Sequence, residues 1–214
     1  MDWYRWQDGY DGPDSYYGRR LVLVQDRIRA AMDEAPPGPL TAVSLCAGQG
    51  RDLIGALHDH PRRADVRALL VELDERNVVA ARHAAKAAGL SGVEAVAGDA
   101  SLTDQYAGLA PADLVLVCGL LGNITDADVE RVLDHCTQLC RTGGTVVWTR
   151  NRKEPDLVPR VCGWLEERGF ERVWVSEPGL VQAVGAHRHT REPRRLPLGE
   201  RMFDFIGYDK LRRG

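Results

Sequence analysis

The sequence predicts an α/β protein whose mostly parallel sheet lies between two layers of helices. Short apolar runs, typical of strands buried on both faces, alternate with longer segments whose apolar residues recur at helical spacing. The first run, Ala42 to Leu45, leads into a turn that contains Gly48 and Gly50, and a helical pattern begins at Arg51. Strand, glycine turn and helix in this order predict a parallel sheet with helical crossovers.

Three further strands are expected, and each ends next to a glycine or an acidic residue. Leu69 to Glu72 ends in a carboxylate, Val93 to Ala97 runs into Asp99, and Ala112 to Val117 runs into Gly119. Because parallel strands end at the same edge of a sheet, these ends should form one cleft. The helix after Gly50 begins with free N–H groups, which would favour a carboxylate or phosphate of a ligand. The acid at the end of the second strand could accept hydrogen bonds from ribose hydroxyls.

Over residues 41 to 149 the chain resembles the class I, Rossmann-like SAM-dependent methyltransferases. The segment from Ser44 to Gly50 lies where that family has acid-x-Gly-x-Gly-x-Gly, with Ser44 in place of the acid and Cys46 in place of the first glycine. Glu72 lies at the position of the family's ribose acid, and Asp99 at that of its adenine-contacting acid. The aromatic front of the chain and its AHRHT and MFDFIGYD segments resemble an actinobacterial-type branch of the superfamily.

The resemblance implies a three-layer α/β/α sheet with antiparallel strands at its C-terminal end. It also implies an enzyme that uses S-adenosyl-L-methionine (SAM) and releases S-adenosyl-L-homocysteine (SAH). The residues expected to bind this cofactor follow the first four strands. They are Cys46, Ala47, Gly48, Gly50, Glu72, Leu73, Asp99, Ala100, Cys118 and Gly119.

Length and charge restrict the protein class. With 214 residues, the chain predicts a single domain. A net charge of −3, from 28 basic and 31 acidic residues, does not favour nucleic acid as a partner. No apolar run approaches the roughly 20 residues of a membrane span, and the first residues lack the pattern of a signal peptide. We therefore expect a soluble, cytoplasmic protein without a membrane partner; the oligomeric state stays open.

The cysteines predict neither a disulfide framework nor a metal site. Five cysteines are scattered along the chain, which fits a reducing compartment. Cys136 and Cys140 lie one helical turn apart beside His135, but no second cluster completes a tetrahedral site. We expect buried thiols and no bound metal.

Four segments of the single domain differ in character. Residues 1–13 are rich in Trp and Tyr without periodicity and predict an irregular, flexible arm, which either packs loosely on its own domain or closes over the site as a lid. Residues 14–35 predict a helix capped by Asp14 or Ser15. Residues 41–150 form the cofactor-binding core, and residues 151–214 add a helix and strands. Gln182 to His189 or Met202 to Gly207 supplies the final antiparallel strand.

The acceptor is expected to be a small molecule that carries a negative charge. A fifth strand is predicted from Thr145 to Thr149, and the arginines that follow it can grip a carboxylate through paired N–H bonds. His187 is the candidate general base, because an imidazole has a near-neutral pKa, and Asn123 follows the fourth strand as a second candidate for catalysis. The expected acceptor-binding residues are Tyr10, Tyr16, Arg20, Arg150, Asn151 and Arg152.

Two other functions remain open at this level. A nicotinamide-dependent oxidoreductase would also need a glycine turn and an acid, but Arg51 and Asp52 follow Gly50 where a dinucleotide turn requires glycine. A SAM-binding protein without catalysis is compatible with Ser44 and Cys46. Neither the acceptor atom nor the acceptor can be read from the residues.

Overall fold

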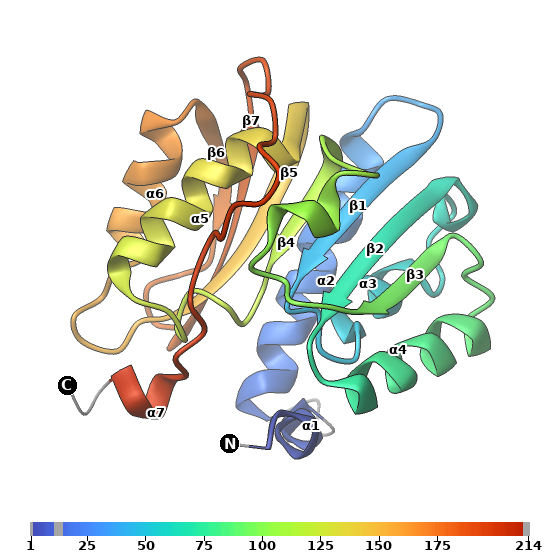
Figure 1. The fold of residues 1–214 in the computed structure, drawn as a ribbon, viewed down its shortest axis with the longest axis horizontal. Coiled ribbons are helices and arrows are strands. Elements are labelled where there is room, and N and C mark those ends of the chain that lie inside the picture. The colour runs from blue at the N-terminus through green and yellow to red at the C-terminus, as the bar shows by residue number, and fades with distance from the viewer. Residues whose placement is uncertain (1, 11–14, 212–214) are drawn as a thin grey trace.

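The computed structural model describes residues 2–10 and 15–211. These residues form a seven-stranded sheet in the order β3-β2-β1-β4-β5-β7-β6 (Figure 1). Strands β1 to β5 run parallel, β7 is antiparallel to β5, and β6 is antiparallel to β7. The strands are β1 (Leu40–Leu45), β2 (Val66–Glu72), β3 (Val93–Ala97), β4 (Ala112–Val117), β5 (Cys140–Asn151), β6 (Phe170–Val175) and β7 (Gln182–His189).

Helices cover both faces of this sheet, as the α/β prediction requires (Figure 1). The apolar residues of α2, α3 and α4 form a core on one face, and those of α5 and α6 form a core on the other. The α-helices are α1 (Trp3–Trp6), α2 (Tyr16–Glu34), α3 (Arg51–Leu57), α4 (Glu75–Ala87), α5 (Asp126–Leu139), α6 (Val158–Glu167) and α7 (Tyr208–Leu211). Short 3-10 helices are η1 (Gln7–Tyr10), η2 (Arg63–Asp65) and η3 (Thr103–Tyr106).

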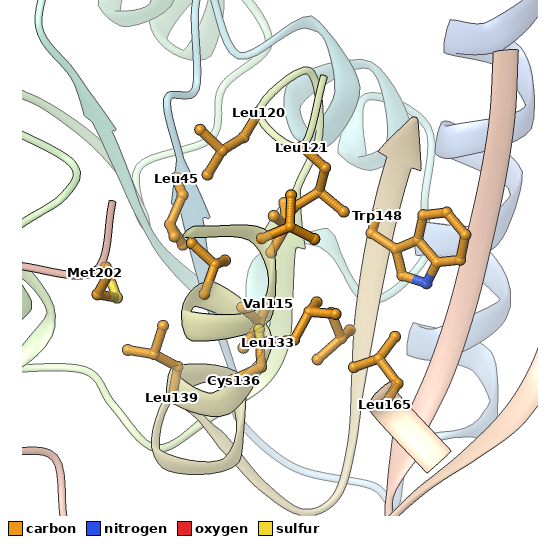
Figure 2. Packing of buried hydrophobic residues seen from close by; sticks show 14 of the residues in the cluster. Leu45, Val115, Leu120, Leu121, Leu133, Cys136, Leu139, Trp148, Leu165 and Met202 are labelled. Carbon is orange, nitrogen blue, oxygen red and sulfur yellow. The ribbon is translucent and has the colours of Figure 1, made fainter. Parts of the chain in front are cut away.

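The core beneath α5 is dominated by large side chains that are fully buried (Figure 2). Trp148 of β5 is its largest member, and Leu120 and Leu121 anchor the loop after β4 in the same cluster. Gly185 of β7 leaves the room that the Trp148 ring occupies, because a Cβ at that position would overlap the ring. This packing holds the loop after β4 firmly at the edge of the sheet.

Two helices start where their capping residues predict. The side chain of Ser15 accepts a hydrogen bond from the backbone N–H of Gly18 at 2.9 Å, and α2 begins at the next residue. Thr125 caps α5 in the same way, accepting from the N–H of Asp128 at 3.1 Å. Asp14, the alternative cap of α2, lies outside the described residues, as do residues 11–13 of the predicted arm.

The structure corrects the expected irregular arm at the N-terminal end of the chain and decides between the two candidates for the final strand. The described part of residues 1–13 is not irregular, since it forms α1 and η1, with Asp2 capping α1. Gln182 to His189 is the strand that pairs with β5, whereas Met202 to Gly207 is extended chain outside the sheet. Helices α1 and α7 both lie at the bottom of Figure 1, where β1 and β2 end.

Candidate functional site

The turn after β1 brings three alternate residues with left-handed backbone to the edge of the sheet. Cys46, Gly48 and Gly50 have φ values of 50°, 56° and 68°. Such values suit glycine, so Cys46 adopts a conformation that is uncommon for its type. The N–H of Ala47 donates to the carbonyl of Val71 at 3.0 Å, which ties the turn to β2. Residues 46–48 of this turn line a cavity beside it.

This first cavity is enclosed by the loops that follow β1, β2, β3 and β4. Gly50 is expected to bind the cofactor but does not line this cavity. Gly50 lies under the turn, against the side chains of Leu70 and Ile54. The structure brings the remaining nine together around the cavity: Cys46, Ala47, Gly48, Glu72, Leu73, Asp99, Ala100, Cys118 and Gly119.

Glu72, at the end of β2, is part of the turn's architecture. One carboxylate oxygen accepts from the N–H of Gly48 at 2.8 Å, and the other accepts from the N–H of Asp74 at 2.9 Å. Each carboxylate oxygen has two lone pairs, so both retain capacity for a hydroxyl donor. Glu72 therefore combines a structural bond to the turn with the chemistry needed to accept hydrogen bonds from a ribose diol.

Asp99, after β3, is held ionised by its neighbours. Its Oδ1 accepts from the N–H and the hydroxyl of Ser101, at 3.0 Å and 2.6 Å, and its Oδ2 lies 3.0 Å from Nη1 of Arg201. Burial opposes ionisation, but these hydrogen bonds and the arginine together keep the pKa of Asp99 below its usual value. The carboxylate remains an acceptor at neutral pH.

Aromatic rings from both ends of the chain close the first cavity. Trp3 of α1 and Phe203 and Phe205 of the C-terminal segment line it, and Trp3 meets Phe205 edge to face with ring centroids 5.2 Å apart. The two phenylalanines are not among the site residues expected from the sequence. Their segment is a candidate strand in the sequence, and a strand pattern does not indicate a site, so the available signal was its aromatic content.

A second cavity adjoins the first, and the two share Trp3, Arg20 and Gly119. A Cβ at Gly119 would meet nothing within 4 Å, which shows that the backbone here borders open space. The expected acceptor-site residues Tyr16, Arg20, Arg150 and Asn151 line the second cavity, together with Asn123. Further lining residues are Tyr17, Gly122, Thr149, Lys153, Val181, Gln182, Tyr208 and Asp209.

Positive charge predominates around this second cavity. Among the described lining residues, Arg20, Arg150 and Lys153 are cations, and Asp209 is the carboxylate. Arg150 donates to the carbonyl of Leu121, and its Nη2 lies 3.7 Å from Asp126. Burial lowers the pKa of Arg150, but from so high an ordinary value that the group stays charged. An anion in this cavity would meet a favourable potential.

Arg20 connects the two cavities. Although it is buried, its guanidinium lies between the rings of Tyr10 and Tyr17, 5.4 Å and 5.5 Å from their centroids, and donates to the Tyr10 hydroxyl. Tyr10, expected at the acceptor site, lines the first cavity instead. Burial raises the pKa of Tyr10 to about 12, so the phenol is neutral at physiological pH.

Arg152 does not reach either cavity. Its Nη1 contacts Asp156 at 3.1 Å and its Nη2 donates to the carbonyl of Ser176 at 3.0 Å. The chain leaves the sheet after Asn151, and the side chain of Arg152 joins the loop before α6 to the one after β6. The structure therefore separates Arg152 from Arg150, with which the sequence analysis had grouped it.

The structure also places His187 away from both cavities. His187 pairs with Val146 in the antiparallel β5–β7 ladder, whereas the cavity-facing end of β5 pairs with Gln182. Its Nδ1 accepts from Nε1 of Trp148 at 3.1 Å, and the residue is fully buried. Burial, assisted by Arg172, lowers the pKa of His187 to about 4. The expectation that His187 reaches the acceptor is wrong, because an antiparallel strand turns it toward the opposite half of the sheet.

Asn123 lines the second cavity, but its amide serves as a structural tie. Nδ2 donates to the carbonyl of Gly119 at 2.7 Å, and Oδ1 accepts from the N–H of Tyr208 at 2.9 Å. The backbone carbonyl of Asn123 also accepts from Ile206 and Gly207. Asn123 thereby connects the loop after β4 to the C-terminal segment, which fits a positioning role.

Neither a cluster of metal ligands nor a membrane-spanning helix is found among the described residues. No group of three or more His, Cys, Asp or Glu side chains among them could hold a metal ion. Within residues 2–10 and 15–211, no helix combines the length and the apolar character needed to cross a membrane.

Comparison with known proteins finds a family match over the segment that contains the loops after β1 to β4. Residues 42–144 match a family described as a methyltransferase domain. A search of curated proteins finds no match. Among solved structures, the chain is similar to an O-methyltransferase family protein from Burkholderia thailandensis, with 20% identity and a TM-score of 0.64 over 81% of this chain. The alignment covers 56% of that protein, so the chain spans little more than half of its length.

Two other solved structures are covered almost completely. One is a 1,6-didemethyltoxoflavin-N1-methyltransferase from Burkholderia thailandensis, with bound 1,6-didemethyltoxoflavin and SAH. It is 19% identical, with a TM-score of 0.64 over 86% of this chain and 85% of that chain. The other is a TehB-like SAM-dependent methyltransferase from Corynebacterium glutamicum, 16% identical, with a TM-score of 0.57 over 81% of this chain and 96% of that chain. At these identities the similarity shows a shared fold.

Proposed function

We propose that this chain is a SAM-dependent methyltransferase that acts on a small anionic acceptor bound in the second cavity, since residues 42–144 match a methyltransferase domain. The observation that carries the proposal is the position of Arg150 and Lys153 in a cavity that joins the first one at Gly119. A small acceptor also fits the didemethyltoxoflavin methyltransferase, a structural neighbour with a small-molecule ligand. The actinobacterial-type branch and the cytoplasmic location stay predictions from the sequence.

The residues of the first cavity suit SAM. The turn at Gly48 supplies close backbone approach, Glu72 supplies acceptors for ribose hydroxyls, and Leu73 and Ala100 supply apolar contacts near the expected adenine. Gly119 borders open space at the junction of the two cavities, so we expect transfer to occur beside it. SAM brings a methyl group that is already activated on a sulfonium, so the protein mainly has to align the two reactants.

An anionic acceptor is consistent with the absence of a histidine from the described lining of the second cavity. No histidine is among the described residues that line the second cavity, and burial raises the pKa of Tyr16. An acceptor that enters as a carboxylate, phenolate or enolate needs no proton removed. Its lone pair forms the new bond to the methyl carbon while the carbon–sulfur bond breaks, and SAH leaves as a neutral thioether. The cations would lower the pKa of a weakly acidic acceptor and favour this form.

The buried state of Arg150 further supports this role. Its Nε is buried and has no hydrogen-bond partner among the described residues, and its Asp126 partner is 3.7 Å away and half exposed. A partly desolvated guanidinium is stabilised by a carboxylate that can accept paired N–H bonds. Lys153 lies 4.8 Å from the centre of the Tyr208 ring, which places a second cation on the same wall.

The experiment measures SAH formation with matched acceptors. Each carboxylic acid or phenol in a panel is tested beside its neutral amide or methyl ether. We expect turnover with the acidic members alone. For the best acceptor, Arg150→Gln should raise KM by about tenfold or more, because a charged hydrogen bond contributes roughly 1.5–3 kcal/mol. SAH affinity, measured by calorimetry, should stay within about twofold.

Arg152→Gln is the matched control, since Arg152 has the same charge two residues away and faces Asp156. Its KM should match that of the original protein. Preferred turnover of the neutral members, or an unchanged KM in Arg150→Gln, would exclude the anionic acceptor. SAH should also raise the melting temperature, whereas NAD should not, which separates SAM binding from the oxidoreductase alternative.

A further inference from the structure

One polar side chain in the first cavity has no assigned role. Asn77 lies in the first turn of α4, five residues after Glu72, and its side chain is almost completely buried, with 1% exposed. The same residue lines the cavity beside Leu73 and Ala100. Its Oδ1 is buried, and no donor in the described part of the chain lies within hydrogen-bonding distance. Asn77 thus lines the cavity and carries an acceptor that no described donor satisfies.

Such a group destabilises the ligand-free protein. Leaving a buried acceptor without a donor is unfavourable, which is why buried amides are nearly always hydrogen-bonded. The neighbours of Asn77 in the helix do not remove this cost, since Val78 and Ala81 are apolar core residues. A ligand with a matching polar edge would satisfy the amide and gain affinity.

We propose that Asn77 hydrogen-bonds the adenosine half of the cofactor, and so acts as an additional residue that recognises SAM and SAH. Asn77 follows the loop of Glu72, the acid expected at the ribose, and shares the cavity wall with Asp99, the acid expected near adenine. An Asn amide offers one donor and one acceptor side by side, which matches an adenine edge as well as a ribose hydroxyl. This inference rests on SAM binding and is independent of the acceptor proposed above.

The test compares two buried amides that lack partners. Gln138 of α5 also has a buried side-chain oxygen with no partner among the described residues, but it lines neither cavity. Asn77→Leu and Gln138→Leu each replace an unsatisfied amide by an apolar group of similar size. SAH affinity is measured by calorimetry, and the melting temperature is measured without ligand.

We expect Asn77→Leu to weaken SAH binding by about tenfold, while the melting temperature without ligand stays equal or rises. A residue that only supported the fold would lower that temperature. Gln138→Leu should leave SAH affinity unchanged. If Asn77→Leu does not fold, Asn77→Ala is measured in the same way, because the smaller side chain cannot clash in the cavity.

Ligand analogues identify the contacted part. The loss in Asn77→Leu should be the same for 5′-methylthioadenosine, which lacks the amino-acid end, as for SAH. If Asn77 contacts the base, the original protein should bind SAH more tightly than the SAH analogue that has a 6-oxo group in place of the 6-amino group, and Asn77→Leu should bind the two equally. If the contact is to the ribose, the variant should lose discrimination against the 2′- or 3′-deoxy analogue. Unchanged SAH affinity, or unchanged discrimination against all of these analogues, overturns the proposal.

Discussion

The ring of Trp3 packs edge to face against the ring of Phe205, with centroids 5.2 Å apart. These residues come from the two ends of the chain, and both line the first cavity. The N-terminal side of this contact is tied to α4, since Asp2 pairs with Arg76 at 2.8 Å. The C-terminal side is held by Asn123, which binds the backbone of residues 206–208. The two ends of the chain together close the proposed SAM site.

The contact between Trp3 and Phe205 should therefore control how long SAH stays bound. We predict that Phe205→Ala increases the SAH dissociation rate several-fold, since an aromatic pair contributes about 0.5–1.5 kcal/mol beyond area burial. A double-mutant cycle with Trp3→Ala should give a coupling energy of that size. Leu198→Ala, at an exposed residue outside both cavities, is the control. Stopped-flow SAH release measures the rate, and strictly additive effects would contradict the closure.

Glu72→Gln should impair both the turn and cofactor binding. The glutamine has one acceptor oxygen, so it cannot accept from Gly48 and Asp74 through separate oxygens as the carboxylate does. We predict a loss of about 1–2 kcal/mol in unfolding free energy and a fall in SAH affinity of tenfold or more. Urea denaturation and calorimetry measure the two effects. Glu94→Gln, at an exposed position on β3, should change neither. Unchanged SAH affinity in Glu72→Gln would remove Glu72 from the site.

Gly119→Ala tests the junction between the cavities. Gly119 and Gly143 have similar positive φ values, 77° and 80°, and a Cβ at either would meet nothing within 4 Å. Alanine at each should thus cost a similar unfolding free energy, about 1 kcal/mol from the left-handed backbone. Only Gly119→Ala adds a methyl group to the cavity wall, so we predict a reduced kcat in that variant alone. Equal kcat values in the two variants would show that transfer does not occur beside Gly119.

His187 should make the protein less stable at acidic pH. Its folded pKa, about 4, lies below the unfolded value near 6.5, so the unfolded state binds the proton between these values. The unfolding free energy should therefore fall as the pH drops from 6.5 toward 4, by up to about 3 kcal/mol.

His187→Gln tests this dependence, because glutamine does not titrate and can still accept from Trp148. Urea denaturation at several pH values should give a shallower slope in the variant across this window. Below pH 4 the contribution of His187 should be constant, since both states then bind the proton, and further loss would come from carboxylates such as Asp99. The same slope in both proteins would show that His187 is not the responsible group.

The residues after β1 to β4 illustrate what the sequence alone determines. Short apolar runs define the parallel strands, and strands that run parallel must end at one edge. Local pattern and this single rule were enough to expect Gly48, Glu72 and Asp99 close together, and the structure brings them to one cavity. Cap residues such as Thr125 are equally local, because a cap bonds within its own turn.

Only the tertiary structure decided the positions that depend on strand direction, on loop paths and on contacts between distant segments. His187 lies in the wrong half of the sheet because β7 runs antiparallel, and Arg152 turns toward Asp156 because the chain leaves β5 before it. Phe205 reaches Trp3 through a segment without regular structure. The missing partner of Asn77 is visible only after all its neighbours are placed, since satisfaction of a buried polar group is a property of the packed molecule and not of any stretch of its sequence.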